Sequence, residues 1–336
     1  METLETHLLS RFIFARFQFS LKALDRINMP VYKGSTLRGG FGHAFKKVVC
    51  VKREKICETC LLKGKCVYSY VFETPPPSDT TKMKKYPYAP HPFVITPPLE
   101  EKRTYSPNDT LCFELTLIGK AIDFLPYFIY TFDELGKIGI GQGKGKYYLE
   151  EVRAIRTGES RKVKGQRAKD EQAKVIYSGK NKILQNNFNV LKINDLGFLN
   201  LSPSTLTLSF ITPTRLKFDG NLSSTLEFHV LFRNLLRRIS LLSYFHCGEE
   251  LDLDFKGFIE EARSIKIDKE NLHWRDWERY SNRQETKMKM GGFVGSVTFQ
   301  GELERFLPFL FLGEYIHVGK GTSFGLGKYK ILNFES

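Results

Sequence analysis

An internal repeat is the feature that most constrains the fold of this chain. Shifting the sequence by 182 residues aligns Phe124-Leu125-Pro126 with Phe306-Leu307-Pro308. The same shift, without a gap, aligns Gly139, Gly143, Gly145, Lys146 and Tyr147 with Gly321, Gly325, Gly327, Lys328 and Tyr329, so that eight of 24 positions are identical. This spacing exceeds the units of solenoids and propellers. It predicts two copies of one domain, each ending in an apolar helix, a glycine-rich loop and a strand.

The start of each copy has a strand pattern followed by a helix pattern. Apolar and polar side chains alternate over residues 12–21 and again over 205–210, which predicts strands. Ser35 is a candidate N-cap for a helix that reaches about Val49, and residues 228–242 have the apolar spacing of one helix face. With strands between, the order is β-α-β-β-α-β, the ferredoxin-like arrangement.

We therefore expect an α+β protein with two tandem ferredoxin-like, RRM-like domains. The N-terminal domain spans residues 1–200 and the C-terminal domain residues 201–336. A length of 336 residues agrees with about two domains.

The charge of the chain points to an anionic partner. The net charge is +14 at pH 7 and the pI is about 9.4. Nucleic acid is the first candidate, because Lys and Arg that neutralise phosphates release counterions and supply sequence-independent affinity. No apolar run reaches the roughly 18 residues of a transmembrane helix, and the first ten residues lack the basic start of a signal peptide. We expect a cytoplasmic protein with no membrane partner; the oligomeric state stays open.

The second glycine-rich loop, from His317 to Tyr329, contains four glycines and two lysines. Glycines allow backbone amides to approach a ligand, and lysines supply charge. A glycine-rich connection without a ligand has a similar composition, but the second copy favours RNA binding. The predicted RNA-binding residues are Gly319, Lys320, Gly321, Thr322, Ser323, Gly325, Gly327 and Lys328, together with Arg233 and Arg237. Arg238 also lies off the apolar face of the helix at 228–242, although solvated arginines have the same pattern.

Two further segments have unusual compositions. The basic loop at 159–175 carries six Lys or Arg between Arg161 and Lys174, and is either a solvated loop or an RNA-facing one. The proline-rich stretch from Thr74 to Pro98 predicts an extended excursion and no core element.

Four of the six cysteines lie within seventeen residues, at Cys50, Cys57, Cys60 and Cys66. Disulfides are disfavoured in a reducing compartment, whereas four thiolates can close a tetrahedral zinc site or hold an iron–sulfur cluster. Unligated thiols are the remaining alternative. We expect a structural metal, mainly zinc, in a cysteine-rich insertion of the first domain, with no role in chemistry because a closed site has no open coordination position.

The usual signatures of nucleotide and metal chemistry are absent from the sequence. Neither glycine loop fits the P-loop spacing or the dinucleotide pattern, and no compact carboxylate pair indicates a two-metal nuclease. RNA can be cleaved without metal, because its 2′-hydroxyl attacks the adjacent phosphate when a base, an acid and a cation assist. His43 is the candidate base or acid, with Lys46 and Lys47 on the same helix and Tyr32 in the preceding loop. A solvated helical histidine has the same pattern.

Several segments resemble one known family. The stretch from Gly34 to His43, the residues Tyr280 to Gln284, the turn from Gly291 to Ser296, and the loop from Gly319 to Gly327 are similar to the CRISPR precursor-crRNA-processing endoribonucleases of the RAMP superfamily. The similarity spans nearly the whole chain. The cysteine cluster departs from the general pattern of that family.

The resemblance implies tandem ferredoxin-like domains, a glycine-rich loop against RNA, and metal-independent cleavage of a CRISPR repeat RNA that leaves a 2′,3′-cyclic phosphate and a 5′-hydroxyl. It implies that His43 is the general base or acid, that Lys46 or Lys47 stabilises the phosphorane, and that Tyr32 orients groups or transfers a proton. No cofactor is then needed for catalysis, and the partners are CRISPR repeat RNA and other CRISPR effector subunits.

Two other functions remain open at this stage. One is a non-catalytic RAMP subunit that holds crRNA in an effector complex, and the other is a zinc-stabilised adaptor that docks on proteins. If His43 is not catalytic, His317 and His246 are the next histidines to consider.

Overall fold

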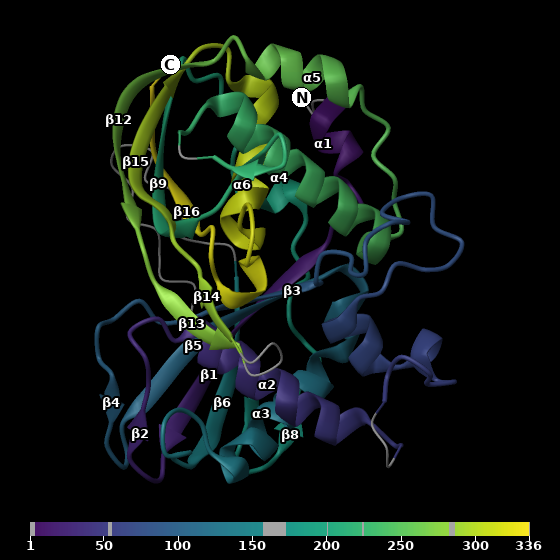
Figure 1. The fold of residues 1–336 in the computed structure, drawn as a ribbon, viewed down its shortest axis with the longest axis vertical. Helices are drawn as coiled ribbons and strands as arrows, with labels where there is room; N and C mark the ends of the chain where they lie inside the picture. Colours follow the sequence, from purple (N-terminus) through teal and green to yellow (C-terminus); the bar gives the residue numbers. More distant parts are fainter. Residues whose placement is uncertain are drawn as a thin grey trace. The chain divides into compact units, whose positions relative to one another are not determined.

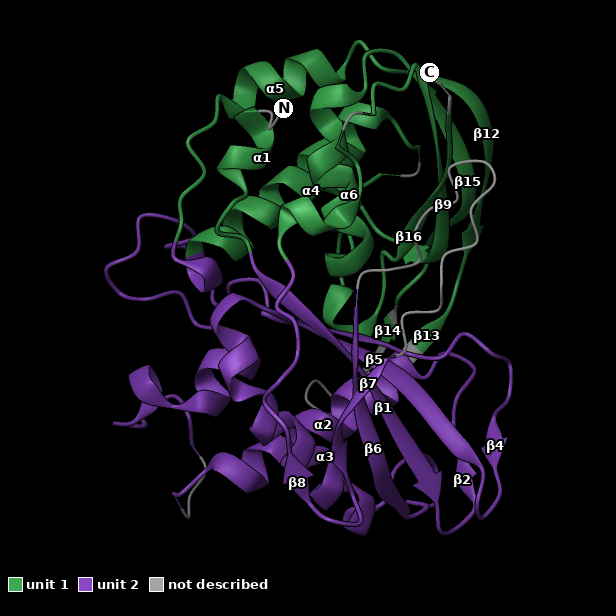
Figure 2. Cartoon of the chain, turned by 180° about the vertical axis from the view of Figure 1, so that it is seen from behind, with its two compact units in different colours: residues 1–12, 192–244, 249–336 green, residues 13–191, 245–248 purple. Residues whose placement is uncertain are grey.

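The computed structural model describes residues 4–52, 56–156, 173–199, 201–223, 225–281 and 286–335. It contains two compact units, coloured separately in Figure 2. The N-terminal unit comprises residues 13–191 and 245–248, and the C-terminal unit comprises residues 1–12, 192–244 and 249–336. We expected the first domain to span residues 1–200, but residues 1–12 and 192–200 belong to the C-terminal unit.

Parts of two expected features lie outside the described residues. Only residues 173–175 of the expected basic loop at 159–175 are described, and residues 282–284 of the Tyr280 to Gln284 motif are not.

The N-terminal unit is built on an antiparallel sheet of order β3-β5-β1-β6-β7-β8. Its strands and helices are β1 (Phe14–Ala23), α2 (Gly34–Val49), β3 (Phe93–Thr96), β5 (Thr110–Ile118), α3 (Leu125–Ile138), β6 (Tyr147–Ile155), β7 (Lys174–Ser178) and β8 (Ile183–Leu184). A small separate ladder joins β2 (Ile27–Asn28) to β4 (Thr104–Tyr105).

The C-terminal unit is built on a second antiparallel sheet of order β12-β15-β9-β16. Its main elements are β9 (Thr205–Thr214), α4 (Phe228–Leu242), β12 (Lys266–Arg275), β15 (Gly292–Gln300), α6 (Leu307–Ile316) and β16 (Tyr329–Glu335). Smaller elements are α1 (Leu4–Leu8), α5 (Phe255–Ala262), the hairpin of β10 (Lys217–Phe218) with β11 (Asn221–Leu222), and the hairpin of β13 (Glu278–Ser281) with β14 (Thr286–Lys289).

The two main sheets share one strand order. In each sheet, the first strand (β1 or β9) lies between the third (β5 or β15) and the fourth (β6 or β16), and the second (β3 or β12) flanks the third; β7 and β8 extend only the N-terminal sheet. Helices α4 and α6 lie together on one face of the C-terminal sheet (Figure 1). The predicted α+β class, with antiparallel sheets, is therefore confirmed.

The proline-rich stretch contributes a core element, so the prediction of an excursion with no core element was wrong. Strand β3 pairs with β5, and the side chains of Phe93, Val94 and Ile95 are fully buried. Prolines are tolerated here because β3 is an edge strand and Pro92 and Pro97 stand just outside it. A short strand between prolines has too few residues for its alternation to be recognised.

Helix α2 extends to Val49, as predicted, but it begins at Gly34 with Lys33 at the cap position. The expected N-cap at Ser35 was therefore wrong. Phe41 lies at the centre of the buried face of α2, and its ring stacks on Phe128 of α3 with centroids 4.7 Å apart. This aromatic packing leaves the opposite face of α2 exposed.

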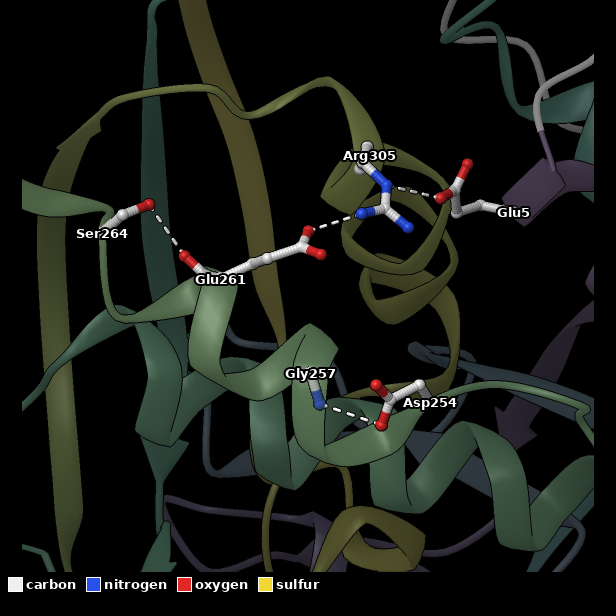
Figure 3. A network of polar contacts seen from close by, with 6 residues as sticks. All are labelled: Glu5, Asp254, Gly257, Glu261, Ser264 and Arg305. Atoms are coloured by element: carbon white, nitrogen blue, oxygen red, sulfur yellow. Dashed lines mark hydrogen bonds and ion pairs between the residues drawn. The ribbon is translucent and has the colours of Figure 1, made fainter.

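An arginine explains why the first residues of the chain belong to the C-terminal unit. Arg305 donates from Nε to Glu5 of α1 at 2.8 Å and from NH1 to Glu261 of α5 at 2.5 Å (Figure 3). These two carboxylates raise the pKa of Arg305 through their hydrogen bonds. The side chain thus joins two sequence-distant helices to the segment that precedes α6.

The repeated helices end at different places. Helices α3 and α6 start at residues 182 positions apart, as do strands β6 and β16, but α6 ends four residues earlier than the repeat predicts. The C-terminal glycine loop is longer as a result, and it includes Lys320. The residue that caps α3 is Gly139 (φ 89°, ψ 159°), whereas His317 caps α6 with φ 63° and ψ 169°. That backbone region is nearly restricted to glycine.

We predict that His317→Gly is more stable than His317→Ala by roughly 1–2 kcal/mol, because both lose the buried ring but only alanine keeps the strained Cβ. The free energy of unfolding in urea measures the difference. At Glu260, which is exposed within α5, the usual order of alanine above glycine is expected. Equal or greater stability of the alanine variant at position 317 would show that the backbone there is not strained.

Candidate active site and nucleic-acid interface

The exposed face of α2 carries the candidate catalytic histidine. Gly39, His43 and Lys47 are exposed and follow one another at intervals of four residues, so they form one stripe. The Lys47 ammonium forms no ion pair or hydrogen bond with another residue in the described part of the chain. The stripe therefore presents an imidazole and a free cation to solvent.

Gly39 leaves open space one turn before His43. A Cβ atom built on Gly39 has no heavy atom within 4 Å, whereas one on Gly42 would lie 2.1 Å from the Phe72 ring. Packing explains why residue 42 is glycine and gives no reason for glycine at residue 39. Because glycine inside a helix costs about 1 kcal/mol relative to alanine, an unexplained glycine at this spacing from a histidine was a signal that the sequence interpretation missed.

The other predicted catalytic residues differ in their access to solvent. The Lys46 ammonium lies 5.4 Å from the centre of the Tyr68 ring, so it is partly engaged by the protein. Burial raises the pKa of the Tyr32 phenol well above its usual value. Tyr32 is therefore neutral near pH 7, and it can donate a hydrogen bond but cannot act as a phenolate base.

A buried lysine holds the segment between Tyr32 and α2. Lys33 is fully buried, and its Nζ donates to the Glu100 carbonyl at 2.7 Å. Burial lowers the pKa of Lys33, and the nearby Glu100 charge opposes that change. The Tyr105 hydroxyl donates to the side-chain Oε1 of Glu100 at 2.5 Å. These contacts fix the start of α2 relative to a distant loop.

The C-terminal glycine loop is docked on the end of β9 through backbone hydrogen bonds. Gly327 donates to the Pro213 carbonyl at 3.1 Å, and Lys320 donates to the Arg215 carbonyl at 3.0 Å. A Cβ atom on Gly319 would lie 2.3 Å from the Arg215 oxygen, so this approach requires glycine. The loop that contains the predicted RNA-binding residues from Gly319 to Lys328 therefore has a defined shape.

The arginines of α4 divide into exposed and buried ones. Arg233 and Arg237 are exposed, and Arg233 NH1 forms an ion pair with Asp219 Oδ1 at 3.7 Å. Arg238 is buried instead, which corrects its assignment to the solvent-facing side: Nε donates to the Ile316 carbonyl at 3.0 Å, while NH2 has no partner among the described residues. Burial lowers the pKa of Arg238 to about 9. Arg238 supports the end of α6, where the glycine loop begins.

His246 and His317 are buried and hydrogen-bonded. His246 donates from Nε2 to the Pro90 carbonyl at 2.8 Å, and its Nδ1 lies 3.0 Å from the Tyr70 hydroxyl. His317 donates from Nδ1 to the Leu326 carbonyl at 3.1 Å. These contacts give both side chains structural roles, whereas His43 is exposed.

The four clustered cysteines do not form the expected metal site. No group of three or more His, Cys, Asp or Glu within the described residues, which include Cys50, Cys57, Cys60 and Cys66, could hold a metal ion. Cys57 and Cys66 pack partly buried against the hydrophobic core, and the Cys50 thiol lies 3.7 Å from the Lys52 carbonyl. The four thiols are thus the right donors for zinc, but among the described residues they are not gathered into the tetrahedral site that was expected.

Of the helices that the structure describes, none combines the length and the apolar character that crossing a bilayer requires.

Two family models match the chain over separate ranges. Residues 10–187 match AF_1859_N, described as an N-terminal domain, and residues 208–329 match the CRISPR-associated endoribonuclease Cas6. The first match covers more than half of the chain, and together they include the helix with His43 and the C-terminal glycine loop.

An uncharacterized protein of Archaeoglobus fulgidus is 25% identical over 311 residues, which cover 90% of this chain and 93% of the relative. A Cas6 product complex has a similar fold, with a TM-score of 0.58 at 16% identity, over 95% of this chain and 99% of that one. Cas6 of Thermus thermophilus has a TM-score of 0.53 at 15% identity, over 96% and 99%. The C-terminal part of the chain is thus similar to the CRISPR-associated endoribonuclease Cas6, and the chain belongs to the AF_1859_N family, whose model matches residues 10–187.

Proposed function

We propose that this protein is an endoribonuclease that cleaves CRISPR repeat precursor RNA into mature guide RNA. The observation that carries the proposal is the exposed stripe of Gly39, His43 and Lys47 on α2, in a chain whose C-terminal half matches the Cas6 endoribonuclease model. The stripe combines the His43 imidazole, the Lys47 ammonium and the open space at Gly39.

The reaction uses the nucleophile that the RNA itself provides. The 2′-hydroxyl attacks the adjacent phosphorus, the bond to the 5′-oxygen of the next nucleotide breaks, and a 2′,3′-cyclic phosphate and a 5′-hydroxyl remain. His43 removes the 2′ proton or protonates the leaving oxygen. Lys47, or Lys46 after leaving the Tyr68 ring, stabilises the negative phosphorane. Tyr32 can supply a hydrogen bond or a proton, and the reaction in this form requires no cofactor.

We infer that the two units are ferredoxin-like domains that arose by duplication. The shared β-α-β-β-α-β order, the shared strand order of the main sheets and the repeated sequence support this inference. Each domain would then present one part of the function: the catalytic stripe in the first, and the glycine loop in the second.

RNA is the proposed ligand of the C-terminal loop. The net charge of +14 favours a polyanion, and the loop from Gly319 to Lys328 exposes Lys320, whereas the predicted contacts Thr322, Ser323, Gly325 and Gly327 are buried. Arg233 and Arg237 are exposed on α4 and would add phosphate contacts. Similar folds occur in Cas6-RT-Cas1–Cas2 complexes, with a TM-score of 0.55, and other CRISPR proteins are therefore the proposed protein partners.

We expect His43→Ala to lower the single-turnover rate of repeat RNA cleavage by about 10²-fold or more, because proton transfer loses its donor or acceptor. A denaturing gel of RNA incubated with excess protein in EDTA measures the rate and the product ends. His273→Ala removes another exposed histidine and should retain the wild-type rate.

Equal cleavage by the His43→Ala variant would place the chemistry at other residues. If the wild-type protein binds the RNA in a salt-dependent manner without cutting it, the chain is instead a non-catalytic RAMP subunit that holds crRNA.

Gly39→Ala should separate stability from activity. Alanine at an exposed helix position should raise the free energy of unfolding by about 0.5–1 kcal/mol, whereas the added methyl should slow RNA cleavage about tenfold by blocking close approach beside His43, an effect of about 1.4 kcal/mol. Urea denaturation and the gel assay measure the two effects.

Gly42→Ala is the matched control on the same helix. It should lower stability by about 1–3 kcal/mol, because its Cβ meets the Phe72 ring. A wild-type cleavage rate for Gly39→Ala would show that RNA does not approach this position.

A further inference from the structure

Three basic residues meet where the glycine loop joins the end of β9. Arg215 directly follows β9, Lys217 begins β10, and Lys320 comes from the loop after α6. The Lys320 amide donates to the Arg215 carbonyl at 3.0 Å, so the two segments are joined at the basic residues themselves. We call Arg215, Lys217 and Lys320 the basic cluster.

The backbone on both sides of the basic cluster is fixed. Asn234 of α4 donates from Nδ2 to the Lys217 carbonyl at 2.9 Å, and its Oδ1 accepts from the Lys217 amide at 3.3 Å. On the other side, Gly319 has no room for a Cβ atom because the Arg215 carbonyl lies against it. The backbone therefore holds the three basic side chains in place before a ligand binds.

No acidic residue neutralises the basic cluster. Within the described residues, Arg215, Lys217 and Lys320 form no ion pair with a carboxylate. Asp219, on the same hairpin, pairs with Arg233 instead. Partial desolvation of the Lys320 ammonium lowers its pKa, and the charges of Lys217 and Arg215 lower it further.

The contacts of Arg215 leave its charge uncompensated. Burial lowers the pKa of its guanidinium. Among the described residues, its buried Nε has no hydrogen-bond partner, and NH1 donates to the Met290 sulfur at 3.3 Å. Sulfur is a weak acceptor, so this guanidinium lacks the oxygen ligand that a buried arginine normally has.

An anion between these side chains would remove the repulsion and satisfy the guanidinium. Phosphate fits best, because arginine binds its oxygens in a planar, bidentate manner and lysine adds a point charge. The amides of Gly319 and Gly321, which make no hydrogen bond within the described part of the loop, are additional donors.

We propose that Arg215, Lys217 and Lys320 bind one phosphate group of the RNA backbone, a site that rests on the proposed function. The site contacts no base, so it contributes affinity and register without reading sequence. Arg215, Lys217 and the supporting Asn234 are residues that the sequence interpretation missed.

The test compares the full-length wild-type protein with Lys320→Ala, Arg215→Ala and Arg215→Lys. Fluorescence anisotropy measures the affinity for repeat RNA and for an unrelated single-stranded RNA at several salt concentrations. Each alanine variant should bind both RNAs about 5–20-fold more weakly, and the salt slope should fall by about 0.7 for each lost phosphate contact. Arg215→Lys should lie between the wild type and Arg215→Ala, because lysine keeps the charge and loses the bidentate geometry.

Two controls separate a site effect from a general loss of charge or fold. Arg263→Ala removes an exposed arginine that pairs with Glu260 on α5, and should leave affinity and slope unchanged. Lys320 is exposed, so Lys320→Ala should fold even if Arg215→Ala does not. Wild-type affinity and slope for Lys320→Ala would overturn the site and leave the nuclease proposal standing.

A failure of the proposed function has a different signature. If the wild-type protein binds no RNA, inorganic phosphate is titrated while thermal unfolding is followed. Stabilisation of the wild type that Lys320→Ala lacks would support a phosphate site with another source of phosphate. Equal behaviour of the two proteins would overturn the phosphate site as well.

Discussion

The docking of the glycine loop onto the end of β9 is the constraint on which the C-terminal unit depends. Two backbone hydrogen bonds, from Gly327 to Pro213 and from Lys320 to Arg215, hold the loop. They require close approach at glycine, since Gly327 would place a Cβ atom 1.8 Å from the Val318 oxygen. Because the bonds belong to the backbone, the exposed Lys320 side chain stays available to a ligand.

Buried polar side chains hold both ends of this loop. Arg238 donates to the last carbonyl of α6, and His317 ties the end of the helix to Leu326 near the end of the loop. A histidine in a backbone region suited to glycine costs about 1–3 kcal/mol. The first copy has Gly139 at the equivalent helix end and a shorter loop. The strain thus accompanies the longer loop, which carries Lys320.

In the N-terminal unit, one face of helix α2 packs in the hydrophobic core and the opposite face is exposed to solvent. One face carries Phe41 into an aromatic core, and Gly42 allows Phe72 to approach the helix. On the other face, a Cβ atom built on Gly39 meets no heavy atom within 4 Å among the described residues, so packing does not explain this glycine. The buried face is rigid, so the exposed histidine and lysine keep a constant spacing. This is the arrangement that a general acid or base requires, since proton transfer depends on short distances.

Local patterns in the sequence determined the α+β class, the strand at the start of each copy and the end of α2, because alternation and helical spacing depend on neighbours in the chain. They also located His43 on an exposed surface and predicted the glycine loop as a distinct element. Only the tertiary structure decided that Phe93 begins a core strand, that Arg238 is buried and that the cysteines form no metal site among the described residues. It alone brought Arg215 and Lys217 to Lys320, because these residues are about one hundred positions apart in the sequence. Contacts of this kind depend on long-range packing, which local periodicity in the sequence does not predict.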